Sequence, residues 1–482
     1  MSPRPSRRRY PGNRGSGLLQ PTTRLHVSGY RFLVRRMEHA LVRGDTRMLD
    51  DPIRAQSISL AVGGILAAAI LGVSVIVALV RPAGEIGDAA IVVVRDSGAT
   101  YVQMGDVLHP VFNMASARLI AGMPVDPRMV DQRAVDSAHR GPQLGIPGAP
   151  ASISTPLTSE ESSWTVCDDA GGETVVIAGP IADTAMASES GVLVRPRGGS
   201  AATTYLLYGS RRARVDLRHP AVVRALRLEG IAPQPISASI LSAIPEAPEI
   251  APPHIPGAGS PGPRRLRGYP VGSVLKVVRT NADSEEDYFV VLANGVQRIG
   301  EVTADLIRYT DSHVGGQIPT VAPDLIAAVP VRETLPVGTF PESSGATEFP
   351  VVCARWRAGP TGGDASTTVL GGEAAPLISR PAALAQADAD GPAVDAVAVP
   401  PGRSVFAHSV GLTGGGQGAG SLYLITDTGV LYGIRDGEAA SSLGLTAPAQ
   451  PAPWPVLSAL PHGPELSRRD ASVARDGLVA SP

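Results

Sequence analysis

The chain has 482 residues, a formal net charge of -2 at pH 7 and 4% aromatic residues. A charge so close to zero gives no global support for a nucleic-acid partner, because such partners require a strongly basic surface. A chain of this length is expected to form two or more subdomains, and with so few aromatic residues their cores must consist of Val, Leu, Ile and Ala.

The N-terminal arm, residues 1–56, is basic, with twelve arginines and four acidic residues. Basic flanks stay on the cytoplasmic side of a membrane, so the arm is predicted to lie inside the cell. Topology and attraction to anionic lipid explain these arginines better than DNA binding does.

Within this arm, "VSGYRFLVRRMEHALVRGD" is typical of an amphipathic helix. Ser28 is expected to cap its start and Gly44 to end it. Two interpretations stay open for its apolar face, namely a helix lying on the membrane surface and a helix docked in the groove of a cytosolic partner. The apolar face consists of residues at helical spacing: Tyr30, Leu33, Met37 and Leu41.

Residues 57–80 are predicted to form a single transmembrane helix, because no charged residue interrupts this stretch. A helix of about 24 residues rises roughly 36 Å, which exceeds a hydrocarbon core of roughly 30 Å. The run lacks a polar stripe, and it starts too far from the N-terminus for a cleaved signal. The chain beyond Val80 is therefore predicted to lie on the exported side.

Small residues recur every four positions within this span, at Gly64, Ala68 and Gly72. Such a face lets a second helix approach closely, so we expect helix packing here. The alternative is that these residues face lipid and reflect only the abundance of Gly and Ala.

Both cysteines, Cys167 and Cys353, follow the span, in "SSWTVCDD" and "FPVVCARW". Two cysteines in an oxidising compartment favour a disulfide. The alternative is two separate buried thiols.

Four segments of the exported region share one pattern, a tyrosine in an apolar run, a turn, a second strand and a helix. They cover residues 90–122, 202–231, 286–310 and 420–446, and their tyrosines are Tyr101, Tyr205, Tyr288 and Tyr423. One such unit is too small to bury a core alone. The predicted fold is therefore a mainly-β (α+β) domain over residues 81–460, with a central β-rich core that the disulfide crosses and four hairpin-and-helix repeats around it.

Stretches rich in Pro and Gly are expected to be loops rather than helices or central strands. They are "GPQLGIPGAP", "IPEAPEIAPPHIPGAGSPGP" and "TAPAQPAPWP". The middle one is expected to divide the domain into two halves of two repeats each, in a quasi-two-fold arrangement. Residues 461–482 are predicted to be a flexible tail.

The sequence gives no positive case for catalysis. The sole lysine, Lys276 in "GSVLKVV", follows no glycine-rich phosphate-binding loop. Histidine and cysteine spacings match no metal site, and no serine-hydrolase motif is present. No catalytic residue, metal or cofactor is therefore predicted from the residues.

Long ordered stretches of the chain resemble the EccB family of the type VII (ESX) secretion membrane complex. They include "VSGYRFLVRRMEHALVRGDTRMLDDPIRAQS", "HPVFNMASARLIAG", "YPVGSVLKVV", "LITDTGVLYGI" and "LPHGPEL", together with both cysteine segments. One departure is Gly433 in "LYGI", where the family more often has proline, and this puts the local loop conformation in doubt.

This resemblance implies a structural subunit of the inner membrane, with a cytoplasmic N-terminus and a periplasmic domain that self-associates within a ring of protomers. The implied partners are the EccC ATPase, EccD, EccE and a mycosin protease. Family members are labelled ATPases, so ATP is implied by that label alone. A third interpretation is peptidoglycan binding, because the repeats resemble those of a cell-wall-binding phage-lysin subunit.

Overall fold

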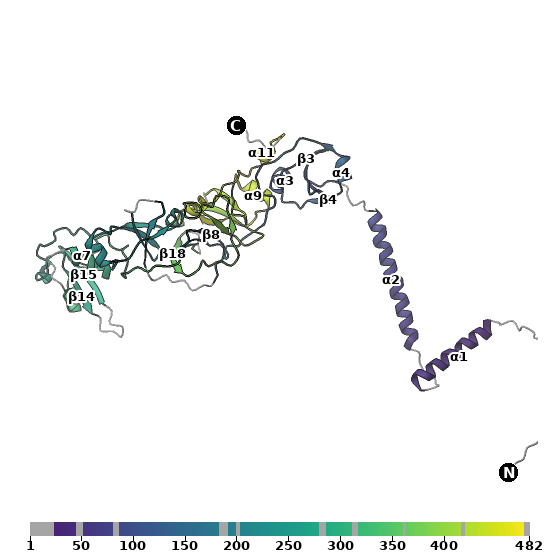
Figure 1. Ribbon diagram of the computed structural model, residues 1–482, viewed down its shortest axis with the longest axis horizontal. Coiled ribbons are helices and arrows are strands. Elements are labelled where there is room, and N and C mark those ends of the chain that lie inside the picture. Colours follow the sequence, from purple (N-terminus) through teal and green to yellow (C-terminus); the bar gives the residue numbers. More distant parts are fainter. Residues whose placement is uncertain are drawn as a thin grey trace, which may run out of the picture. The chain divides into compact units, whose positions relative to one another are not determined.

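The structure is a computed structural model in which the chain forms two compact units, Met1–Ala83 and Gly84–Pro482 (Figure 1). It describes residues 24–44, 52–80, 86–182, 191–198, 203–278, 286–310, 317–359, 363–415 and 420–476.

Helix α1, Arg24–Arg43, contains the predicted amphipathic segment. It begins before Ser28, so that residue lies inside the helix and the expected cap is wrong. Gly44 ends the helix as predicted. Its φ of +67° is left-handed, and its N–H donates to the carbonyl oxygen of Ala40 at 2.9 Å.

Helix α2, Pro52–Val80, contains the whole predicted span. It starts earlier than expected, at a proline, which suits the first position of a helix because the missing N–H would have had no partner there. Within it, Ser57–Ile76 is long and apolar enough to cross a membrane, and none of this stretch is buried inside the unit.

Five sheets are present in the described part of the C-terminal unit. The central sheet has the order β18-β17-β7-β8-β20-β19. Its strands are β7 Trp164–Asp169, β8 Thr174–Ala178, β17 Val351–Ala358, β18 Ala365–Gly372, β19 Ala382–Ala383 and β20 Ala396–Ala398. This sheet is therefore assembled from two stretches of chain that lie far apart in sequence.

The other four sheets each contain one of the predicted segments. The first has β1 Ile91–Val94, β2 Thr100–Met104, β3 Val107–Pro110, β4 Arg128–Val130 and β5 His139–Arg140, with α3 Met114–Ala121 and α4 Gln132–Asp136. The second has β9 Val192–Pro196, β10 Tyr205–Tyr208, β11 Arg211–Val215, β12 Gln234–Ile236 and β13 Glu246–Ile250, with α5 Pro220–Ala225 and α6 Ala238–Ser242.

The third sheet has β14 Val274–Val278, β15 Glu286–Leu292 and β16 Gly295–Ile299, with η1 Arg264–Leu266, α7 Glu301–Thr310 and α8 Pro323–Ala327. The fourth has β21 Arg403–Val410, β22 Leu422–Ile425, β23 Leu431–Ile434 and β24 Gln450–Pro453, with α9 Gly437–Leu443, α10 Trp454–Leu457 and α11 Arg468–Ala471. The short strand β6, Thr155–Pro156, also pairs with β21.

In all four segments an antiparallel hairpin precedes a helix. The first two hairpins turn in two residues, and their first turn residues, Gly105 and Gly209, have φ values of +61° and +54° that favour glycine. Gly433, expected in a loop, lies in β23 opposite Tyr423.

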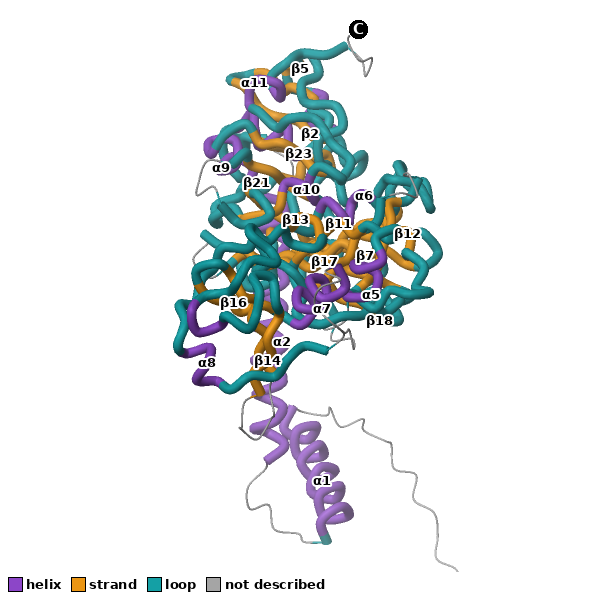
Figure 2. Tube along the Cα trace, turned by 90° about the vertical axis from the view of Figure 1, so that its left-hand side faces the viewer, coloured by secondary structure: helices purple, strands orange, loops and turns teal. Residues whose placement is uncertain are grey.

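The segments pair in space differently from the prediction. Helix α3 of the first segment packs against α9 of the fourth and against α11 (Figure 1). Figure 2 shows α9 and α11 at the same end of the C-terminal unit. Leu119 and Leu443 belong to one apolar cluster. Helix α5 of the second packs against α7 of the third, where Leu226 and Leu306 share a cluster. The predicted grouping of the first with the second segment and the third with the fourth is therefore wrong, because each short helix buries its apolar face against a helix from the other half of the sequence.

Two of the predicted loops contain regular structure. Strand β13 lies in the middle proline-rich stretch, and β24 and α10 lie in the last one. Both strands occupy sheet edges and pair in parallel, β13 with β11 and β24 with β21. The loop prediction is wrong there, although proline does keep these strands out of central positions.

The predicted flexible tail is also wrong for residues 461–476. His462 and Leu466 form bridges to Leu431 and Ile434 of β23, and Leu466 and Ala471 are fully buried. Both side chains belong to the cluster shared by α3 and α9, so burial of apolar surface holds this segment in place. Residues 477–482 lie outside the described residues.

Candidate functional site

The two cysteines meet in the central sheet. Cys167 of β7 lies directly opposite Cys353 of β17, with Cα atoms 4.1 Å apart, and their sulfur atoms form the predicted disulfide. The bond joins neighbouring strands of one sheet and does not cross a core between two halves, which corrects that expectation. It nevertheless links positions 186 residues apart in sequence.

A buried ion pair lies beside the disulfide. Asp168 of β7 is 3% exposed, and its carboxylate accepts hydrogen bonds from the backbone N–H and the hydroxyl of Ser237. The guanidinium Nη2 of Arg197, just after β9, lies 3.3 Å from this carboxylate. Arg197 also donates to Gly172 and Thr174, so the pair ties the second sheet to the central sheet.

Burial raises the pKa of Asp168 above its usual range, while the Ser237 N–H and the Arg197 charge oppose that rise. Sequence reasoning missed this pair. The available signal was the "CDD" ending of a strand whose other residues are apolar, since a carboxylate inside an apolar strand requires a partner.

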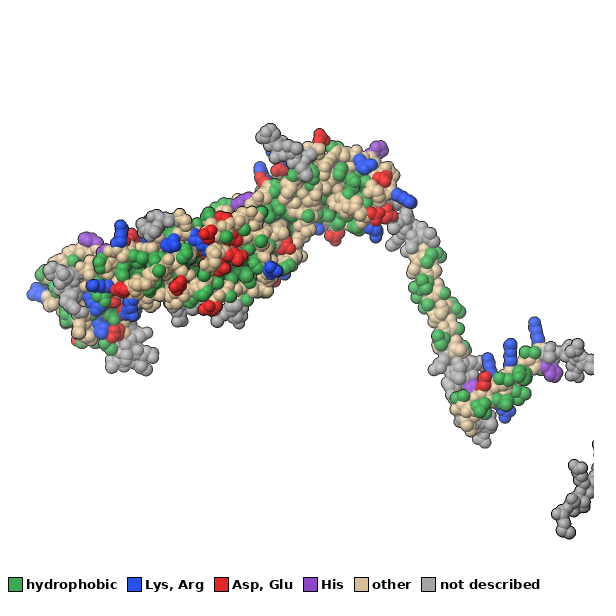
Figure 3. Space-filling model, viewed as in Figure 1, with side chains coloured by type: hydrophobic (Ala, Val, Ile, Leu, Met, Phe, Trp, Pro, Cys, Tyr) green, Lys and Arg blue, Asp and Glu red, His purple; other side chains and the backbone are tan. Residues whose placement is uncertain are grey.

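The predicted residues of α1 share one exposed apolar face. Tyr30, Leu33, Met37 and Leu41 are all more than half exposed. Figure 3 shows hydrophobic side chains along α1. This surface is available to a membrane or a partner, and both interpretations stay predictions.

The predicted packing face of α2 is open. Gly64, Ala68 and Gly72 are exposed, and a Cβ atom added at Gly64 or Gly72 would meet no atom within 4 Å. The helix therefore has room for close approach of a second helix at this face, and contact with such a helix stays a prediction.

Lys276 is engaged within the third sheet. Its Nζ lies 2.8 Å from Glu286 Oε1, and the Tyr288 hydroxyl donates to Glu286 Oε2 at 2.7 Å. Lys276 and Tyr288 together hold the pKa of Glu286 below its usual range, and burial is the main reason that the pKa of Tyr288 is raised. In the described ranges, no group of three or more His, Cys, Asp or Glu residues could hold a metal ion.

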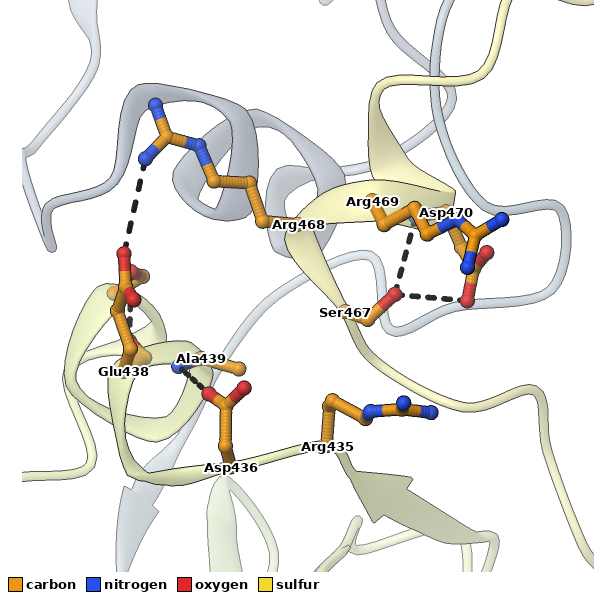
Figure 4. Close-up of a pocket in the computed structure, with 9 residues that line it drawn as sticks. Arg435, Asp436, Glu438, Ala439, Ser467, Arg468, Arg469 and Asp470 are labelled. Atoms are coloured by element: carbon orange, nitrogen blue, oxygen red, sulfur yellow. Dashed lines mark hydrogen bonds and ion pairs between the residues drawn. The ribbon is translucent and has the colours of Figure 1, made fainter.

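A charged cavity of about 300 Å³ lies between α9 and α11 (Figure 4). Two of its carboxylates form hydrogen bonds at the starts of the helices. Asp436 accepts a hydrogen bond from the backbone N–H of Ala439 at the start of α9, and Asp470 accepts one from the Ser467 hydroxyl at the start of α11. Arg468 lies 3.8 Å from Glu438. The arrangement stabilises the starts of two short helices, and its Ser467 hydroxyl is engaged by Asp470 and by the first turn of α11.

Three comparisons bear on this geometry. A family model described as "Type VII secretion system ESX-1, transport TM domain B" matches residues 19–480. The chain is 39% identical to the "ESX-3 secretion system ATPase EccB3" of Mycolicibacterium smegmatis, covering 95% of this chain and 92% of the relative. It is 33% identical to the "ESX-5 secretion system ATPase EccB5" of Mycobacterium tuberculosis, covering 97% and 96%.

Solved structures agree with the sequence comparisons. A chain of an intact ESX-5 inner membrane complex is 31% identical, with a TM-score of 0.71 over 97% of this chain and 98% of that chain. A chain of the EccB3 dimer from the ESX-3 core complex is 36% identical, with a TM-score of 0.70 over 80% and 100%.

Proposed function

The chain belongs to the EccB family of type VII secretion proteins, and from this premise we propose that it is a structural, single-pass subunit of a type VII secretion membrane complex. The observation that carries this proposal is the likeness over nearly the whole chain to a subunit of an intact ESX-5 inner membrane complex. The C-terminal unit self-associates and shapes the periplasmic side of the export machine, as the likeness to an EccB3 dimer supports.

Deletion and complementation test this role. Loss of the chain should abolish export through its own secretion system, because the membrane complex then lacks a subunit. The full chain should restore export, and a chain without Met1–Ala83 should not, since it loses α1 and α2. Normal export in the deletion strain would contradict the proposal.

The arginine-rich arm supports an orientation in which α2 crosses the inner membrane, residues 1–56 lie in the cytoplasm and the C-terminal unit lies in the periplasm. A protease added to spheroplasts should digest the C-terminal unit and spare the arm. Digestion of the arm alone would reverse the assignment.

The partners proposed are those that the family implies, namely EccC, EccD, EccE, a mycosin protease and further copies of this chain. We expect partner subunits to contact the open face of α2 within the membrane and the apolar face of α1 on the cytoplasmic side. The quasi-two-fold relation of the repeats is proposed for the pairs α3–α9 and α5–α7, whose helix contacts support it.

Replacing Gly64 and Gly72 together by leucine should lower recovery of the partner subunits. Leucine keeps the span apolar, so insertion is preserved, but its bulk holds a second helix away. Native gel mobility of the detergent-extracted complex measures this. The matched control, Ile70→Leu with Val73→Leu, changes exposed apolar residues that point away from this face of the same helix and should migrate like wild type. Equal migration of both double variants would show that this face contacts lipid.

An enzymatic role is the second candidate, because relatives carry the name ATPase. No cofactor is proposed for the structural role, and peptidoglycan binding by the repeats stays a weaker alternative. Calorimetric titration of the purified chain with ATP separates the first two functions, and pull-down on purified cell wall tests the third.

Lys276→Ala should leave export nearly unchanged. The Lys276 ammonium group forms an ion pair with Glu286 at the edge of a sheet. A partly exposed ion pair of this kind contributes little to stability. Secretion of native substrates by the variant strain is the measurement. Loss of export by a variant that still folds and assembles would support a nucleotide role for this lysine.

A further inference from the structure

The two faces of the central sheet are covered unequally. One face carries Trp164, Val166, Val352 and Trp356 and belongs to the largest apolar cluster, which also receives residues of α6, α10, β21 and β22. The opposite face carries the disulfide in a smaller cluster, with Val175, Ile177, Val351, Ala396 and Ala398. Over this second face four partly buried apolar residues make contact, and two of them, Ala375 and Leu377, belong to the segment Glu373–Pro381, which has no regular secondary structure.

A groove of about 420 Å³ lies between this segment and the sheet. Its volume falls within the roughly 300–1,000 Å³ typical of ligand sites. Its apolar wall includes Cys167, Val175, Val351 and Leu377. Ile378, next to the groove in sequence, is 61% exposed. An apolar side chain placed in the groove would therefore be removed from water.

The charged residues lining this groove are all acidic: Asp169, Glu173 and Glu373. Among the described residues none of these three carboxylates forms an ion pair. Asp169 accepts the N–H of Glu173 in the β7–β8 turn. Unbalanced negative charge around an apolar floor favours a ligand that carries cations beside an apolar group.

The sheet register sets the spacing of these charges. Gly372, Val351 and Asp169 lie side by side in β18, β17 and β7, and Glu373 follows Gly372. Adjacent strands are about 4.8 Å apart, so the backbone positions of Gly372 and Asp169 lie about 10 Å apart on either side of Val351. In an extended peptide, residues i and i+4 point to one side about 13 Å apart, and residue i+2 points the same way between them.

We propose that this groove binds an extended peptide segment of a partner protein with the pattern cation–x–apolar–x–cation, where the apolar side chain enters the groove and the cations meet Glu373 and the Asp169–Glu173 turn. The proposal does not depend on the secretion role. It gives the thinly covered face of the central sheet a ligand of defined chemistry.

Photo-crosslinking of the full chain in mild detergent tests the proposal. The probe is the peptide acetyl-Arg-Gly-photoleucine-Gly-Arg-amide, and peptide mapping by mass spectrometry locates the adduct. We expect adducts within Glu373–Pro381 or on Val351. Absence of adducts there, or adducts only elsewhere, would overturn the proposal.

Two controls separate the apolar and the charged parts. Ala374→Phe fills the groove and should abolish the adduct, whereas Ala447→Phe, at an exposed position outside it, should not. A probe with Glu in place of both Arg residues should label about fivefold less, because two exposed charge pairs are lost. Equal labelling by the acidic probe would overturn the charge assignment, and a change of oligomeric state in Ala374→Phe would show that a second copy covers the groove instead.

Discussion

Removing the Cys167–Cys353 disulfide should lower the free energy of unfolding of the full chain by about 2–5 kcal/mol. The bond links residues 186 apart in sequence, so without it the unfolded chain gains much conformational freedom. Denaturant unfolding of the double variant Cys167→Ala with Cys353→Ala, in detergent, measures the loss.

Reductant provides the matched control. Reductant should lower the free energy of unfolding of the wild-type chain nearly to that of the double variant. It should leave the double variant unchanged, because only the wild type has a disulfide to reduce. Mass mapping of unreduced peptides should find the two cysteines linked. Two free thiols in correctly exported protein, or a variant as stable as wild type, would contradict this account.

The variant Arg197→Met should be destabilised by about 3–5 kcal/mol, because it leaves the buried Asp168 carboxylate without its cation. The double variant Asp168→Leu with Arg197→Met should lose less than that, since apolar residues often replace a buried ion pair at small cost. Thermal or denaturant unfolding of the two variants measures the difference. Arg218→Met breaks a surface ion pair with Asp216 and should behave like wild type.

The loss in Arg197→Met should also depend on pH. Burial already raises the pKa of Asp168, and loss of the neighbouring charge raises it further. The folded variant then binds a proton at a pH where the unfolded chain does not, so its stability rises as pH falls through that raised pKa. The loss of stability in Arg197→Met would contradict a structural role for the pair if it stayed constant between neutral and mildly acidic pH. A loss as small as that of Arg218→Met would contradict it too.

Local sequence patterns predicted the parts of this protein that depend on neighbouring residues. The apolar run gave the position of α2, the glycine at position 44 ended α1, and the tyrosine-led segments formed hairpins followed by helices. In each case the structure depends on hydrogen bonds and periodicity within about thirty residues.

The features that the sequence did not predict depend on contacts between residues that lie far apart in the chain. Helix α3 packs against α9, which lies more than three hundred residues later, and no local pattern encodes that choice. Strands β13 and β24 contain proline, and parallel pairing at a sheet edge accommodates them. Leu466 lies in the segment predicted to be a flexible tail, but the cluster of α3 and α9 buries it completely.

The candidate site also combines a feature that the sequence predicts with features that depend on long-range contacts. The two cysteines could be paired from their number and compartment, whereas Asp168 and Arg197 meet only after the second sheet docks on the central sheet. The acidic groove likewise depends on β18, β17 and β7 lying side by side. Its residues come from separate segments of the chain, so their charges could not be grouped before the fold was known.

Purification of the tagged full chain from its native membrane in mild detergent tests the central claim most directly. The chain should elute in a large particle that holds several of its own copies together with EccC, EccD and EccE, identified by mass spectrometry. A correctly inserted chain that purifies alone, as a single copy, would contradict a structural role in the type VII secretion complex.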